Sequence, residues 1–238
     1  MNIPKNSTLL FILFFVAIES NLSAQKSIQN LPYEDLKPYH LGFLFGVHTQ
    51  DLIVHHSGVV DENGDRWYGS VNQYEPGFSV GVIADLRLAD NWSLRGTPTI
   101  HFGSKTLTLF SDVPTTTPVT ANVRSNYCLI PINIRYRGIR VDNYRPYLTS
   151  GFSLGLDMGR DKMQPVLLQP MNVFWEFGVG TDIYMPDFKL VPELKVCFGL
   201  SDILVKNRRD QTNDAFVKYA EAFSSITSRL IVFSIQFE

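Results

Sequence analysis

Large apolar residues alternate with small or polar ones along most of this chain. Between Tyr39 and His48 it reads YHLGFLFGVH, with a large apolar residue at every odd position. A period of two is that of a β-strand, in which successive side chains point to opposite faces of a sheet. Eight segments show this pattern, and they are residues 39–48, 77–88, 91–103, 123–137, 144–158, 172–184, 188–200 and 227–238.

The connections between these segments are alternately long and short. Long polar regions follow the first, third, fifth and seventh segments, and the turns ADN, GIRVDN and MPD follow the second, fourth and sixth. A soluble sandwich has no reason to sort its loops in this way, whereas outer-membrane barrels combine short periplasmic turns with long outer loops. We therefore predict an all-β fold, an eight-stranded antiparallel up-and-down transmembrane β-barrel formed by residues 39–238.

Aromatic residues gather where the strands meet the short turns. Such rings favour the boundary between membrane and water, so they predict a girdle at one rim of the barrel. With an even number of strands, both chain termini lie at this rim, which we assign to the periplasm. The predicted girdle consists of Tyr39, Trp92, Tyr136, Tyr144, Tyr184, Phe188 and Phe237.

The phase of the large apolar residues assigns most charged strand residues to the lumen, whereas a soluble lipocalin-like barrel would carry them on its outer face. Isolated charges in a narrow interior are costly, but paired charges can persist. We favour a structural ion-pair network that plugs the lumen; the alternative, a proton or ion path, needs more continuous water than eight strands enclose. The predicted network consists of Asp85, Arg87, Arg95, Arg135, Asp157, Glu176, Asp182, Glu193 and Lys195.

Prolines and cysteines add two local expectations. Pro98, Pro131 and Pro192 fall inside strands, where proline cannot donate to the ladder, so we expect bulges or bends there. Cys128 lies on the outward phase and Cys197 on the inward phase. Side chains on opposite faces of a closed sheet cannot form a disulfide, and we predict two free thiols.

The N-terminus carries an export signal. Lys5 precedes the apolar run LLFILFFVAI, and the polar, small-residue stretch ESNLSAQ follows it. These three parts form a secretory signal peptide, and the run is too short to cross a bilayer as a helix. We predict a signal peptide over residues 1–24, with an uncleaved anchor as the alternative, and a short periplasmic segment over residues 25–38.

Composition argues against several function classes. A net charge of −2 with 18% charged residues gives no basic face for nucleic acid. No glycine-rich phosphate loop, nucleophile elbow or CxxC motif occurs, so we expect no cofactor, no metal site and no small-molecule substrate. Asp51, His55, His56 and Ser57 are the raw material for an acyl-transfer site, but adjacent histidines on a strand point apart. We therefore expect a protein that is not an enzyme.

The opening of the mature chain resembles one family. The stretch LPYEDLKPYHLGFLFGVHTQDL, in which Pro38, Tyr39 and His40 lead into a Gly-x-x-x-Gly strand, is similar to the PorT/SprT family of outer-membrane barrels. The segments NYCLIPINIRY and YRPYLTSGFSLGLD also match, although similar motifs occur throughout eight-stranded outer-membrane barrels. The resemblance covers residues 25–238.

This resemblance implies a role in type IX protein secretion, a system also linked to gliding motility. The family is needed to export and mature cargo proteins such as secreted proteases. An eight-stranded barrel is too narrow for folded cargo, so the resemblance implies an accessory component that contacts other secretion-system proteins and outer-membrane lipid. The alternatives are a structural or adhesive outer-membrane barrel unrelated to secretion, and a lipid-modifying enzyme.

Overall fold

The computed structural model describes residues 29–59, 66–73, 76–111, 119–124, 126–159, 168–205 and 223–238, so the predicted signal peptide lies outside the described residues. No helix in these ranges is long and apolar enough to cross a membrane. In chain order the elements are the 3-10 helix η2 (Glu34–Leu36) and the strands β1 (Tyr39–His56), β2 (Trp67–Gln73), β3 (Pro76–Arg87), β4 (Trp92–Gly96), β5 (Thr99–Phe102), β6 (Ser104–Ser111), β7 (Val119–Arg124), β8 (Tyr127–Arg137), β9 (Tyr144–Asp157), β10 (Met171–Tyr184), β11 (Lys189–Gly199) and β12 (Phe223–Phe237).

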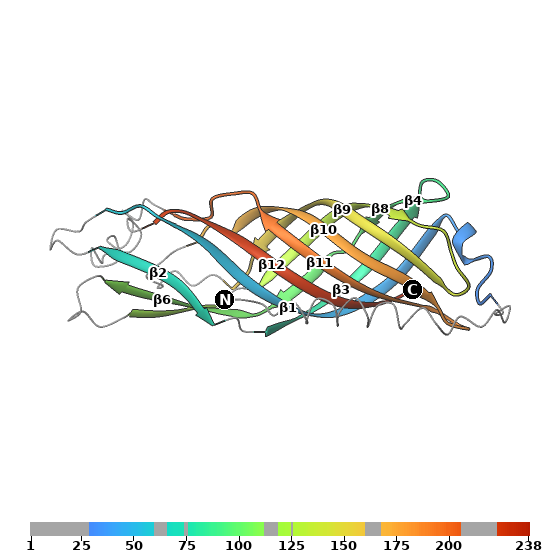
Figure 1. Cartoon of the computed structure of the whole chain (residues 1–238), viewed down its shortest axis with the longest axis horizontal. Coiled ribbons are helices and arrows are strands. Elements are labelled where there is room, and N and C mark those ends of the chain that lie inside the picture. Colours follow the sequence, from blue (N-terminus) through green and yellow to red (C-terminus); the bar gives the residue numbers. More distant parts are fainter. Residues whose placement is uncertain are drawn as a thin grey trace, which may run out of the picture.

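Most of these strands form one closed antiparallel ring (Figure 1). β1 pairs with β12 on one side and with β3 on the other, and the order continues through β4 and β5, β8, β9, β10 and β11. Because β4 and β5 are two parts of a single crossing, the described residues form a ring of eight strands. The predicted all-β, antiparallel, up-and-down arrangement is confirmed.

Prolines mark the irregularities of the ring. The crossing predicted over residues 91–103 is divided into β4 and β5 at Pro98. Pro131 of β8 lies opposite the same gap, between the pairs that β8 makes with β4 and with β5. Pairing of β10 with β11 is also interrupted at Pro192, although β11 remains paired with β12 there. A residue without an N–H cannot complete the ladder, which explains these interruptions.

The two faces of the ring differ in polarity. On β8, Ile132 is 62% exposed, whereas Arg135 of the same strand is 0% exposed. The apolar side chains therefore lie on the outer face, which hydrocarbon rather than water surrounds in a membrane. The cysteines follow the same alternation, because half-buried Cys128 faces outward and buried Cys197 faces the lumen, and both are free.

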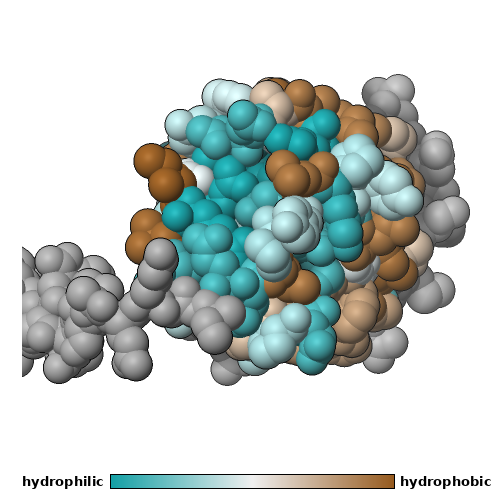
Figure 2. Space-filling view, turned by 90° about the vertical axis from the view of Figure 1, so that its right-hand side faces the viewer, coloured by the Kyte–Doolittle hydropathy of each residue, from teal (hydrophilic) through white to brown (hydrophobic). Residues whose placement is uncertain are grey.

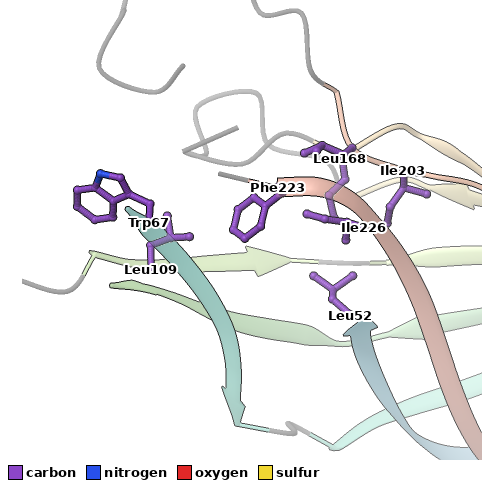
Figure 3. Close-up of a cluster of buried hydrophobic side chains, with 8 residues drawn as sticks. Leu52, Trp67, Leu109, Leu168, Ile203, Phe223 and Ile226 are labelled. Carbon is purple, nitrogen blue, oxygen red and sulfur yellow. The ribbon is translucent and has the colours of Figure 1, made fainter. Parts of the chain in front are cut away.

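The end that carries the long loops has a second sheet and its own apolar core. β2, β6 and β7 pair in that order, and β1 continues to His56, past its predicted limit at residue 48. Buried side chains from β1, β2, β6 and β12 and from the segments near residues 168 and 203 meet there (Figure 3). The cluster consists of Leu52, Trp67, Leu109, Leu168, Ile203, Leu204, Phe223 and Ile226.

Candidate functional site

Charged side chains fill the lumen toward the short turns. Asp85 of β3 accepts a hydrogen bond from Arg95 Nε at 2.7 Å. Arg95 extends across the lumen to the last strand, where it donates to Gln236 Oε1 at 2.6 Å and pairs with Glu238. The other carboxylate oxygen of Glu238 lies 2.5 Å from Lys189 Nζ. Side chains from β3, β4, β11 and the chain end therefore form one connected group.

A second group of pairs surrounds Arg135 of β8. Its guanidinium pairs with Asp182 and lies 3.6 Å above the ring centroid of Tyr147. The Tyr147 hydroxyl donates in turn to Glu193 Oε2 at 2.8 Å. Moving an ion out of water costs several kcal/mol, which close pairing and additional hydrogen bonds offset. Asp182 and the Tyr147 ring offset part of this cost for Arg135, and the Tyr147 hydroxyl offsets part of it for Glu193.

A third group of charged side chains lines a small cavity in the lumen. Lys195 Nζ lies 3.3 Å from a carboxylate oxygen of Glu193 and 3.3 Å from one of Glu176. Asn133 Nδ2 donates to Glu176 at 3.0 Å. The cavity beside them measures about 20 Å³, which is room for about one water molecule. At this level the described lumen is filled by side chains.

Two residues of the predicted network lie at opposite ends of the ring. Arg87, at the end of β3, lies at the rim and pairs with Asp90 of the adjoining turn at 2.5 Å. Asp157, at the opposite end of the ring, accepts a hydrogen bond from the Gly159 N–H at 2.9 Å. Both residues have the inward phase. Arg87 pairs with the turn rather than with the lumen charges, so its assignment to the network is wrong, whereas the assignment of Asp157 stays a prediction.

The predicted girdle needs one correction. Tyr184 is 1% exposed and its hydroxyl donates to Asp35 Oδ1 at 2.6 Å. It shares the inward phase of Asp182 on β10, so alternation turns it away from lipid. Phe237 stacks on the exposed ring of Phe43 with centroids 5.2 Å apart. The remaining members are exposed near the short turns, and they are Tyr39, Trp92, Tyr136, Tyr144 and Phe188.

Several charged residues of this region were not in the predicted network. Glu238 follows Gln236 on the inward phase of the last strand, and Arg137 follows Arg135 on β8. Both lie within the predicted segments 123–137 and 227–238, so reading the alternation to the last residue of each segment would have found them. Asp35 lies in η2, outside any strand, and no periodicity marks it.

The segment before β1 closes the short-turn end of the lumen. The carboxylate of Asp35 lies 3.3 Å from Arg145, 3.7 Å from Arg140 and 3.8 Å from Arg137. Its hydrogen bond from Tyr184 completes the contacts. Figure 2 views this end and shows hydrophilic residues across its centre, with hydrophobic residues around much of its edge. We call Arg137, Arg140 and Arg145 the arginine mouth.

The electrostatics of the mouth favour an ionised Asp35. Burial alone would raise its pKa, but the hydrogen bond from Tyr184 and the charges of Arg145 and Arg137 outweigh burial, so the pKa is lowered from its ordinary value of 3.8. A carboxyl group whose pKa is lowered on docking stabilises the docked state at every pH above the ordinary pKa of that group. That contribution is lost as the pH falls through the lowered pKa.

We therefore expect the segment of residues 29–37 to stay docked at neutral pH and to detach below about pH 3.8. Hydrogen–deuterium exchange of this segment, corrected for the intrinsic rate at each pH, measures the transition. In Asp35→Asn the segment should exchange faster at neutral pH and show little dependence on pH. Equal protection of the two chains at pH 7 would contradict the assignment of Asp35 as the docking residue.

The candidate acyl-transfer residues do not converge. Asp51 Oδ2 lies 2.5 Å from Arg229 Nη2, so its carboxylate is engaged with a cation on β12. His55 and His56 are exposed at the end of β1, and His56 Nε2 lies 3.2 Å from the Gly69 backbone nitrogen. Among the described residues, no group of three or more His, Cys, Asp or Glu side chains is placed to hold a metal ion.

Comparison with known proteins agrees with this architecture. Residues 23–205 match the sequence profile of a family described as outer membrane protein beta-barrel domain. No curated protein matches the chain.

Solved outer-membrane proteins are distant structural likenesses. Neisserial surface protein A has 10% identity and a TM-score of 0.46 over 84% of this chain and 98% of its own. OprG from Pseudomonas aeruginosa has 12% identity and a TM-score of 0.41 over 84% and 91%. Ail of Yersinia pestis has 8% identity and a TM-score of 0.36 over 84% and 98%. Likenesses this distant carry no argument about function.

Proposed function

We propose that this chain, which belongs to the family of outer membrane protein β-barrel domains, is a non-enzymatic component of the outer membrane that serves type IX protein secretion through protein contacts. One observation supports a role in contacts rather than conduction. The lumen is filled by ion pairs, with an internal cavity of about 20 Å³. A folded cargo protein cannot pass such an interior, so another protein must form the conduit.

The proposed orientation places the short turns and both termini in the periplasm. The exposed aromatic residues near the short turns support it, because aromatic rings favour the membrane–water boundary. The lengths of the connections support it as well, since barrels of this kind carry their short turns on the periplasmic side. The segment docked over the lumen then faces the periplasm, and the second sheet faces outward.

The link to type IX secretion rests on the PorT/SprT resemblance of residues 31–52. Within this stretch, Asp35 forms ion pairs with the arginine mouth, and β1 begins at Tyr39. The most specific part of the resemblance thus coincides with the segment that closes the barrel. Contacts made there with other secretion-system proteins are the mechanism we propose.

A structural or adhesive barrel is the second candidate. The sheet of β2, β6 and β7 favours it, because its apolar cluster gives the long-loop end a packed surface that it can present outward. A lipid-modifying enzyme is less well supported, since Asp51 is paired with Arg229 rather than directed at a histidine.

Deleting the gene for this chain should abolish export of proteins that carry the type IX C-terminal signal, as measured by immunoblotting of culture medium. Unprocessed cargo should accumulate in the cells, and the intact gene should restore export. A chain that combines Asp51→Asn, His55→Ala and His56→Ala should also restore it, because no catalysis is proposed there. Normal export after deletion would exclude the secretion role, and failure of the triple variant with an intact barrel would favour the enzyme.

A further inference from the structure

The arginine mouth holds more positive charge than its single partner neutralises. Asp35 is the acidic side chain with which Arg137, Arg140 and Arg145 form ion pairs in the described residues. Three guanidinium groups therefore share one carboxylate. Guanidinium groups match carboxylates best through two parallel hydrogen bonds, and Asp35 cannot give that geometry to all three.

Arg137 is the residue left without such a bond. Its side chain is 0% exposed, and none of its guanidinium nitrogens has a hydrogen-bond partner. Its approach to Asp35, at 3.8 Å, is an ion pair but too long for a hydrogen bond. A buried guanidinium without hydrogen bonds is costly. The mouth therefore has unused capacity for a second carboxylate.

The segment that carries Asp35 is attached by polar contacts. The turn Glu34–Leu36 contains no buried residue, and its one apolar side chain, that of Leu36, is 60% exposed. Asn30 bonds to Asn143 Oδ1 at 2.8 Å and to the Tyr184 carbonyl at 2.9 Å. Because no apolar burial holds the segment in place, another polar chain can readily replace its solvent-exposed polar contacts.

Apolar side chains beside the mouth extend the surface. Ile139 is 81% exposed and Val141 is 62% exposed, and both lie in the β8–β9 turn that carries Arg140. Tyr33 of the docked segment is 76% exposed. Ile139 and Val141 lie between the exposed aromatic residues Tyr136 and Tyr144 along the chain. Together with Tyr33 they place exposed apolar side chains on the segments that carry Arg140 and Asp35.

We propose that the arginine mouth is a docking site for an acidic segment of a partner protein, and that Asp35 occupies it as an internal stand-in. The proposal rests on the proposed function, in which the barrel acts through protein contacts on its periplasmic side. A segment with two or more carboxylates can give Arg137 the hydrogen bond that Asp35 does not, whereas Arg140 and Arg145 already donate to carbonyl and amide oxygens. The mouth lies over the lumen rather than on the lipid-facing surface, which favours a peptide over a lipid headgroup.

Asp35 must compete with the acidic segment of the partner for the arginine mouth. Because residues 29–37 are joined to β1, Asp35 is present at a high effective concentration. Replacing Asp35 with a neutral residue of the same shape should therefore raise the affinity of the barrel for an external acidic peptide. Removing an arginine of the mouth should lower that affinity.

Fluorescence anisotropy of a labelled peptide of alternating glutamate and leucine, titrated with the full mature chain in detergent at low salt, tests the proposal. Asp35→Asn should bind about tenfold more tightly than the unaltered chain, and Arg140→Gln about tenfold more weakly. Arg229→Gln, which removes a cation at the opposite end, should bind like the unaltered chain. A peptide with glutamine in place of glutamate should not bind.

Circular dichroism of each variant confirms that it is folded, and Asp35→Asn decides the question if Arg140→Gln fails to fold. Unchanged or weaker binding by folded Asp35→Asn, or equal binding of the glutamine peptide, would overturn the proposal. Competition by a soluble phosphatidylglycerol as strong as that by the peptide would instead assign the mouth to lipid. The assay requires no secretion, so its failure is separable from that of the secretion experiment.

Discussion

Replacing Arg135 with methionine should destabilise the barrel by about 3–5 kcal/mol, because it leaves a buried carboxylate without its partner. Asp182 is 0% exposed, and Arg135 is the cation with which it pairs in the described residues. Asp85, which Arg135 also approaches at 3.5 Å, keeps its hydrogen bond from Arg95. Denaturant unfolding of the purified chain in lipid vesicles, followed by circular dichroism, measures the change.

Two matched variants make this test specific. Arg229→Met removes a cation from a half-exposed pair with Asp51, and exposed pairs contribute about 0–1 kcal/mol. Combining Arg135→Met with Asp182→Leu removes both buried charges and should recover most of the lost stability. Two results would show that the Arg135–Asp182 pair does not stabilise this part of the lumen. In the first, Arg135→Met has the same free energy of unfolding as Arg229→Met. In the second, the double variant is no more stable than Arg135→Met alone.

Replacing Gly151 with alanine should destabilise the barrel by about 1–3 kcal/mol through overpacking. A Cβ atom there would contact the Ile132 carbonyl oxygen and lie 2.6 Å from Asn133 Cα. Both are backbone atoms of β8, which is paired with β9 along its length. They cannot move aside without disturbing that ladder. The same unfolding measurement gives the change in stability.

Gly96 provides the matched control. A Cβ at Gly96 would have its nearest contacts at 3.8 and 4.0 Å, which is ordinary packing. Alanine should therefore be neutral there or stabilise by about 0.4–1 kcal/mol, because it restricts the unfolded chain. Equal losses at the two positions would indicate a general intolerance of substituted glycines rather than the close approach of β8 to Gly151.

The strands and their two faces were predictable because both are local properties. Alternation along residues 144–158 predicted β9 within one residue of its observed end. Prediction was weaker where elements end, as for β1, which continues to His56 because the second sheet and the last strand extend with it. Two residues at strand ends were misassigned. Arg87 has the inward phase but lies at the rim, past the filled lumen. Tyr184 was assigned to the outer girdle although its phase is inward.

The candidate site was predictable only in part. Phase identified which charges face inward, as for Asp85, Glu176 and Asp182, but it does not identify their partners. Arg95 and Glu238 meet across 143 residues of sequence, and only closure of the ring brings them together. Asp35 lies in a short 3-10 turn without any repeating pattern, so its contact with the arginine mouth had no sequence signal.

The sequence by itself determined that this chain forms alternating strands with an apolar outer face, since side-chain direction in a β-strand depends only on position parity. It also determined that the connections alternate in length. The tertiary structure alone decided which charges pair and that Asp35 contacts the arginine mouth at the short-turn end. Those features depend on distances between strands remote in sequence, which exist only after β1 meets β12.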